Sequence, residues 1–175
     1  MSKKSVFCIA KTQDQAIAIV ERLKAANFSN NDISVLLPDK SGSKDFAHEH
    51  HTKAPEGATT GGVAGGVIGG ALGWLVGIGA LAIPGVGPFI AAGPIMSALG
   101  GAAVGGAVGG LAGALVGMGI PEYEAKRYEA KVKDGNVLLS VHTEDSNEVK
   151  RAKEIFENAG AEDISSTSET APAKK

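Results

Sequence analysis

The chain has 175 residues, of which 21% are charged, and its formal net charge is -2. This length allows one ordinary domain, or a small domain with an added segment. No positive excess and no basic run interleaved with aromatic residues is present, which argues against nucleic-acid binding. The single cysteine, Cys8, excludes an internal disulfide and suits a reducing compartment.

Residues 1–38 have the pattern of the first half of a small α+β unit. SVFCIA (5–10) predicts a buried strand, and DISVLL (32–37) predicts a second strand that ends at Pro38. Between them, Thr12 and Gln15 form a capping box before apolar residues at helical spacing. This part of the chain is therefore predicted to be a βαβ half.

Residues 39–56 form a polar linker that contains His48, His50 and His51. Imidazoles can bind a metal ion or respond to pH near neutrality, so these three are weak candidate metal ligands. No second cluster in the sequence supplies further ligands. A solvated linker is the favoured interpretation, and we expect no metal ion and no cofactor.

Residues 57–120 differ from the rest of the chain. No charged residue occurs between Glu56 and Glu122, a gap of 65 residues that holds 22 of the 25 glycines. GGALGWLVGIG (69–79) is repeated 40 residues later as GGLAGALVGMG (109–119). One four-residue glycine period comprises Gly61, Gly65, Gly69, Gly73 and Gly77, then Gly101, Gly105, Gly109, Gly113 and Gly117; beside it lie Gly62, Gly66 and Gly70, then Gly106 and Gly110.

These repeats predict a glycine-zipper helical hairpin, with Pro84, Pro88 and Pro94 breaking the helices in its connector. Helices of about 20 to 25 residues reach roughly 30 to 37 Å, enough to cross a hydrocarbon core. Glycine ridges allow close helix packing in lipid, so we expect the glycines listed above to mediate helix packing and self-association. Two crossings return both termini to one side.

The leading interpretation places this hairpin in a membrane with both termini in the cytoplasm. The start of the chain has two lysines but no long apolar run, so no cleaved leader is expected. One alternative is a soluble homo-oligomeric ring, filament or shell in the cytoplasm, with the hairpin as its buried core. A second alternative is a membrane pore lined by small residues.

Residues 121–134 predict an amphipathic connecting helix, with Pro121 in its first turn and Tyr123 and Tyr128 either in an aromatic belt or as ordinary helix residues. Residues 135–168 predict the second βαβ half, and residues 169–175 a disordered tail. Shifting the sequence by 131 residues aligns the two halves at several positions, although the apolar stripes of the two helices then fall out of phase.

Together the halves predict an α+β fold, a ferredoxin-like βαββαβ domain that is split by the inserted hairpin. Strand alternation places Val6 and Cys8 on the face beneath the two helices. Phe7, Ile9 and Leu36 then lie on the other face, which either packs against a second copy or the insertion or leaves its apolar residues exposed.

Several segments resemble the bacterial general stress protein family that includes the heat-stress-induced proteins of bacilli. The resemblance covers nearly the full chain, and its most specific parts are IPGVGP (83–88) and GIPEYEAKRYE (119–129). It implies stress-linked expression in a bacterium and no known enzymatic activity, and it transfers no catalytic residues. With a bacterial source, the membrane expected for the hairpin is the bacterial inner membrane.

No catalytic constellation is apparent in the sequence, which lacks both a phosphate-binding Gly-Lys-Ser/Thr motif and a G-x-G-x-x-G turn between a strand and a helix. We therefore expect a non-enzymatic, self-associating, membrane-associated stress protein. Its expected partners are further copies of itself and membrane lipid, with no small-molecule substrate.

Overall fold

The computed structural model describes residues 4–38, 79–83, 87–95, 99 and 110–168. Within these ranges the protein is a mixed α+β structure built on one antiparallel sheet with the strand order β3-β4-β2-β5-β1-β6. The strands are β1 (Lys4–Ala10), β2 (Ile33–Pro38), β3 (Gly79–Ile83), β4 (Gly87–Ala92), β5 (Val137–Thr143) and β6 (Glu162–Ser168).

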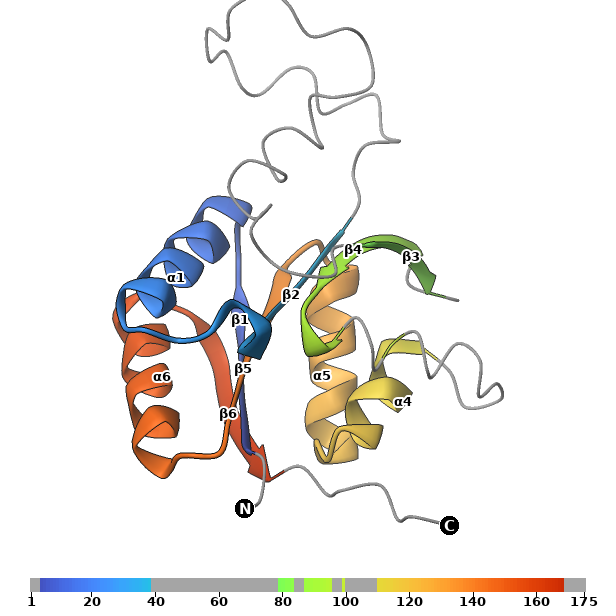
Figure 1. The fold of residues 1–175 in the computed structure, drawn as a ribbon. Coiled ribbons are helices and arrows are strands. Elements are labelled where there is room, and N and C mark those ends of the chain that lie inside the picture. The colour runs from blue at the N-terminus through green and yellow to red at the C-terminus, as the bar shows by residue number, and fades with distance from the viewer. Residues whose placement is uncertain (1–3, 39–78, 84–86, 96–98, 100–109, 169–175) are drawn as a thin grey trace, which may run out of the picture.

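Helices cover both faces of this sheet (Figure 1). On the first face lie α1 (Gln13–Ala25) and α6 (Ser146–Asn158), and on the second face lie α4 (Gly110–Gly117) and α5 (Glu122–Lys133). A short 3-10 helix, η1 (Asn30–Asp32), leads into β2. The described part of the molecule therefore has three layers, with the sheet in the middle.

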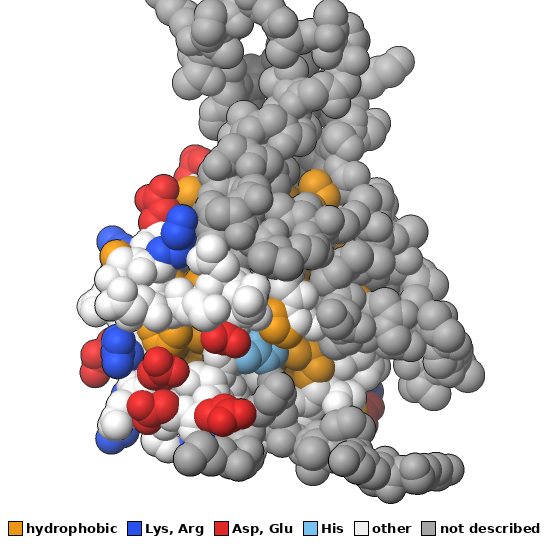
Figure 2. All heavy atoms as spheres, viewed as in Figure 1, with side chains coloured by type: hydrophobic (Ala, Val, Ile, Leu, Met, Phe, Trp, Pro, Cys, Tyr) orange, Lys and Arg blue, Asp and Glu red, His pale blue; other side chains and the backbone are white. Residues whose placement is uncertain are grey.

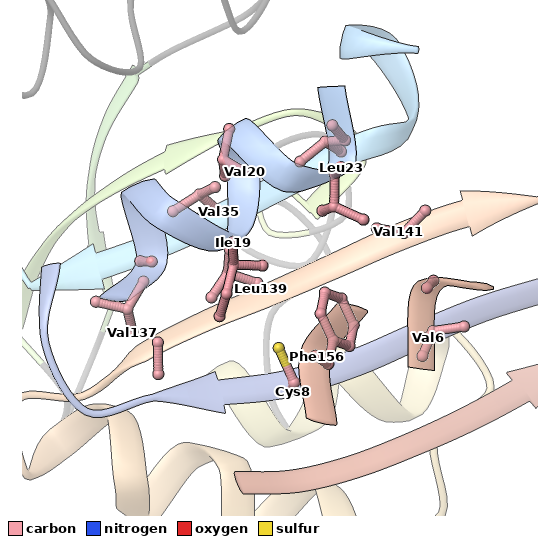
Figure 3. Close-up of a cluster of buried hydrophobic side chains, with 14 of the residues drawn as sticks. Val6, Cys8, Ile19, Val20, Leu23, Val35, Val137, Leu139, Val141 and Phe156 are labelled. Atoms are coloured by element: carbon pink, nitrogen blue, oxygen red, sulfur yellow. The ribbon is translucent and has the colours of Figure 1, made fainter. Parts of the chain in front are cut away.

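The first face carries the core that the sequence predicts. Val6, Cys8, Leu139 and Val141 are all fully buried there with residues of α1 and α6. Figure 3 shows the labelled side chains of the two central strands pointing toward those of the helices, with the Cys8 sulfur beside Phe156. The prediction that Cys8 is a buried apolar residue is confirmed.

The second face is buried as well. Phe7, Ile9 and Leu36 are each 0% exposed and share a core with Tyr128 and Val132 of α5. Helix α4 adds Leu111, Ala114 and Leu115 to the same core. This face is therefore not exposed: the connecting helix α5 and the part of the insertion that forms α4 cover it.

The helix termini form where the sequence predicts them. The Thr12 hydroxyl accepts a hydrogen bond from the Gln15 amide (3.1 Å), and the Gln15 side chain accepts one from the Lys11 amide (2.8 Å). The Gln15 side-chain amide also donates to the carbonyl oxygens of Ala159 and Gly160, both at 2.9 Å. The start of α1 is thereby tied to the end of α6, where the last carbonyls lack intrahelical partners.

The first strand and the helix of each βαβ half match at an offset of 133 residues rather than 131. Lys4 and Val137 begin strands of seven residues, and Gln13 and Ser146 begin helices of thirteen. This two-residue difference accounts for the apolar stripes that fall out of phase at the offset read from the sequence.

The connector of the expected hairpin adds two strands to the sheet. β4 pairs with β2, and β3 pairs with β4 in the next position outward. Residues 57–78 and 100–109, which include most of the two expected glycine helices, lie outside the described residues. Within the described ranges, none of the helices combines the length and apolar character needed to cross a bilayer.

The surface of the first layer is polar. Figure 2 shows acidic and basic side chains interspersed on the side of the molecule that carries α1 and α6. Both helices contain exposed residues of either sign, such as Glu21 and Arg22 on α1 and Lys150 and Glu154 on α6. This mixed-sign surface is typical of helices that face solvent.

Candidate functional site

Polar side chains gather on the second face at one end of the three central strands. Ser5 of β1 lies directly opposite His142 of β5, and Ser34 of β2 lies directly opposite Ser140 of β5. Because residues two apart on a strand share a face, these pairs form one cluster. We call Ser5, Ser34, Ser140 and His142 the serine–histidine cluster.

The imidazole is at the centre of this cluster. Its Nδ1 atom lies 3.0 Å from the Ser5 hydroxyl oxygen, and its Nε2 atom lies 3.1 Å from that of Ser140 and 3.4 Å from that of Ser34. The Phe7 ring meets the imidazole edge-on, with ring centroids 6.4 Å apart. Hydroxyls can donate or accept, so they can satisfy either tautomer of the ring.

The chain of the insertion passes over the Ser34 side of the cluster. The Ile95 amide donates to the Ser34 hydroxyl oxygen at 3.1 Å, and Ile95 is fully buried. Two residues earlier, Gly93 has a φ of +81°, and a Cβ placed there would lie 2.1 Å from the Ile33 carbonyl oxygen. Only glycine permits this conformation and this close approach.

The cluster contains the atom types of a serine nucleophile and its base. Such a pair also needs room for a substrate next to the hydroxyl and donors for the developing oxyanion. Ser5, Ser34 and Ser140 are each 0% exposed, and His142 is 8% exposed. With its hydroxyls enclosed by the fold, the arrangement is suited to satisfying buried polar groups and fixing the insertion against β2.

Helix α4 attaches the end of the insertion to α5. The Ala112 amide donates to Glu129 Oε2 at 2.7 Å, so the carboxylate caps the first turn of α4, while Lys133 Nζ lies 2.7 Å from Glu129 Oε1. Burial by itself would raise the pKa of the Glu129 carboxyl, but these hydrogen bonds outweigh it and the pKa is lowered. The carboxylate is thereby held in the charged form that caps a helix best.

Helix α5 is in turn joined to β6. The Tyr128 hydroxyl donates to the Asp163 carbonyl oxygen at 2.7 Å and lies 2.8 Å from the Ser165 hydroxyl oxygen. Arg127 Nε lies 3.2 Å from Asp163 Oδ1. Tyr128 is fully buried, whereas Tyr123 is 75% exposed, so an ordinary amphipathic helix accounts for both residues.

Three of the glycines expected to pack helices are described. Gly110 begins α4 with a φ of +81°, and its added Cβ would lie 3.1 Å from Glu129 Oε2, so a substitution there would strain the backbone. Gly113 is half-buried and Gly117 is exposed, with nothing within 4 Å of an added Cβ at Gly117. The others, and His48, His50 and His51, lie outside the described residues.

Sequence reasoning did not single out the serine–histidine cluster. The signal was available, because SVF, DISV and LSVHT place hydroxyls and one imidazole at alternate positions of otherwise apolar strands. What the sequence lacks is the register, which alone brings the three strands together at this end. Within the described ranges, no group of three His, Cys, Asp or Glu residues could hold a metal ion.

Comparison with known proteins adds no relative. No family model, no curated protein and no solved structure matches the chain.

Proposed function

We propose that this chain is a non-enzymatic, self-associating protein whose glycine-rich insertion (57–120) mediates assembly. In this proposal the two βαβ halves form a folded body that holds the insertion in a defined place. The protein then acts by assembling with further copies of itself, and it does not catalyse a reaction.

The observation that carries the proposal is the docking of the insertion onto the body. β4 pairs with β2, and α4 buries Leu111 and Leu115 fully in the core of the second face. Gly113 and Gly117 lie on the side of α4 opposite these leucines. These two glycines of the period thus lie on the outer side of a helix whose inner side is fixed, which favours packing against protein.

A ferredoxin-like arrangement of the body belongs to the same proposal. β1, α1 and β2, followed by β5, α6 and β6, follow the βαββαβ order, and the four strands lie in the order β2-β5-β1-β6. The first strand and the helix have equal lengths in the two halves at an offset of 133 residues, which supports two equivalent halves. The insertion would then occupy the β2 to β5 connection.

We further propose a role in bacterial stress, on the resemblance of the IPGVGP and GIPEYEAKRYE segments to the general stress protein family. What the structure adds is a physical reason for the second motif. Its residues form the start of α5, where Ala125 and Tyr128 are fully buried against the sheet.

Membrane association is a second candidate, favoured by the 65 uncharged residues and by the glycine periods within them. In that form the glycine stretches of the insertion would lie in the bacterial inner membrane with both termini cytoplasmic. α4 would have to leave its contacts with α5, or the lipid segment would have to exclude residues 110–120.

The test starts from full-length protein purified without detergent. Light scattering after size exclusion is expected to show a large, uniform oligomer in the soluble fraction. Protein that sediments with membranes after a carbonate wash, and needs detergent for release, would instead select the membrane candidate. A soluble monomer at every concentration would overturn self-association.

The contribution of the glycines is tested separately. Gly69→Leu or Gly109→Leu should separate closely packed backbones and reduce the oligomer while leaving the folded body intact. Gly42→Leu, in the polar linker and outside both glycine periods, is the matched control. An unchanged oligomer in the first two variants would refute close packing through these glycines.

A further inference from the structure

The two ends of the sheet differ in how they are protected. Among the described residues, β6 pairs only with β1 at one end, and β3 pairs only with β4 at the other (Figure 1). An edge strand presents a row of backbone N–H and C=O groups that another strand can pair with. Proteins usually prevent this with charges, bulges or irregular backbone on the edge.

β6 has several of these devices. Its first two residues are Glu162 and Asp163, and Asp163 has a φ of 50°, unusual for a residue with a side chain. The pairing of β6 with β1 also shifts register between Phe7 and Ile9. Glu162 forms an ion pair with Lys11 at 2.6 Å. This edge is charged, irregular and unsuited to a further strand.

β3 has none of the charges. Its sequence is GALAI (79–83), and the nearest charged residues along the chain are Glu56 and Glu122. No proline lies within the strand itself. Two copies of such a strand can therefore pair without like charges facing each other, a condition that β6 would not meet.

A proline identifies the β3 backbone groups that point away from β4. In an antiparallel ladder, opposed residues alternate between pairs that exchange both hydrogen bonds and pairs that exchange none. Pro88 lies opposite Ala82, and proline has no N–H to exchange. Leu81 and Phe89 therefore form a bonded pair, and the N–H and C=O groups of Ala80 and Ala82 point outward.

The pairing of β4 with β2 gives the same alternation. Pro38 lies opposite Phe89, so this pair too is of the kind that exchanges no hydrogen bonds. The backbone groups of Phe89 then point to β3 rather than to β2. Two prolines on different strands thus agree on which backbone groups of β3 point away from β4.

We propose that β3 is an assembly edge, which pairs antiparallel with β3 of a second copy around a two-fold axis. This inference rests on the proposed self-association and names the surface that carries it. A second copy is the occupant because one two-fold contact joins two identical uncharged edges and removes both at once. The two sheets would become one continuous sheet.

The test is Ala82→Pro in the full-length protein. Proline is tolerated on an edge strand where the N–H points outward, so the β3–β4 hairpin should persist while the donor to a partner strand is lost. Because the change occurs in both copies, the dissociation constant of the two-copy contact should rise about 10- to 100-fold. Ala80→Pro, the other outward position, should act in the same direction.

Ser168→Pro is the matched control, because it places a proline on the exposed last residue of the opposite edge strand. It should leave the dissociation constant unchanged. Hydrogen exchange at the β4 amides reports whether the hairpin has persisted in each variant. In the wild-type protein, the amides of Ala80 and Ala82 should exchange more slowly as the protein concentration rises.

The outcomes separate this inference from the proposed function. An oligomer that survives both proline changes with β4 still protected would overturn the β3 edge but leave self-association standing. A wild-type protein that is monomeric throughout would overturn both. Slow exchange at Ala80 and Ala82 that does not depend on concentration would also overturn it, because another strand of the same chain would then cover the edge.

Discussion

Gly93 is the residue at which the backbone of the insertion comes closest to β2. An added Cβ would lie 2.1 Å from the Ile33 carbonyl oxygen and 2.9 Å from the Ser34 Cα atom, and both are backbone atoms that no side-chain movement can displace. Directly after this turn, Ile95 donates its amide hydrogen to the Ser34 hydroxyl. One glycine therefore determines whether the insertion can reach the serine–histidine cluster.

Gly93→Ala should lower the free energy of unfolding by about 2 to 4 kcal/mol, because it adds backbone strain to a steric overlap. Gly117→Ala is the control, since nothing lies within 4 Å of its added Cβ. It should change stability by no more than about 1 kcal/mol, and in the favourable direction, because alanine favours a helix. Urea unfolding of both variants measures the difference, and equal stabilities would contradict the contact at Gly93.

Tyr128 links α5 to β6 through a buried hydroxyl, and burial raises its pKa from 10.0 to about 12, against a smaller lowering by the hydrogen bond with Ser165. A raised pKa means that the folded protein holds this proton more tightly than the unfolded chain. Stability from this group is therefore fully present below pH 10 and is lost as the pH rises toward 12.

The chain has two tyrosines, so the variant Tyr123→Phe retains only Tyr128. The measurement is an absorbance titration of this variant. Ionisation is expected near pH 12 with concurrent loss of the folded signal. Tyr128→Phe should cost about 1 to 2 kcal/mol at neutral pH, since the carbonyl of Asp163 loses a donor. A normal titration near pH 10 in the folded state would contradict the burial of the hydroxyl.

At the scale of elements, α4 decides how the insertion is held. The helix is only eight residues long, too short to be stable by itself in water. Its order comes from Leu111 and Leu115, both fully buried on the second face, and from the Glu129 carboxylate at its first turn. Packing therefore stabilises a glycine-containing helix that propensity alone would not.

Leu111→Ala should lower the stability of the whole domain by about 2 to 5 kcal/mol if α4 is part of the core. Val116→Ala is the control on the same helix, because Val116 is 43% exposed, and it should cost less than about 1 kcal/mol. Thermal unfolding of the two variants gives the comparison. Similar stabilities would mean that α4 does not contribute to the folded core.

Much of the body could be predicted from the sequence, and the missing parts have physical causes. The strands and helices of both halves follow from apolar alternation and from caps such as Thr12, because these signals are local. β3 and β4 could not be recognised, because GALAI and GPFIAA lie among uncharged residues where no polar face marks a period. The serine–histidine cluster depends on register across three strands, which no local pattern contains.

At the scale of the whole molecule, the sheet separates two cores that each require both halves of the chain. β1 is paired on both sides, by β5 and by the edge strand β6, and Cys8 on this strand is fully buried beneath α6. Burial also raises the pKa of the Cys8 thiol well above its ordinary value. The one cysteine of the chain is thus placed where only a large opening can expose it.

A thiol reagent should accordingly modify Cys8 only through unfolding of the domain. The free energy obtained from the labelling rate should match that from urea unfolding, because the central strands open last. Labelling that is much faster than global unfolding would show that β1 separates from the sheet in a smaller opening. Gly93→Ala should speed the labelling by the factor that corresponds to its loss of stability.

The strand order also determines when each strand can first pair with its partners during synthesis on the ribosome. β1 and β2 do not pair with each other. β1 pairs with β5 and β6, and β2 pairs with β4 and β5. At roughly 5 to 20 residues per second, the ribosome needs roughly 5 to 30 s after β1 emerges before β5 is available. During that interval β1 has neither of its two partner strands, although β2 can already pair with β4. The nascent chain should therefore be a client for chaperones, even though the finished protein buries every residue of β1 except Lys4, which is half-buried.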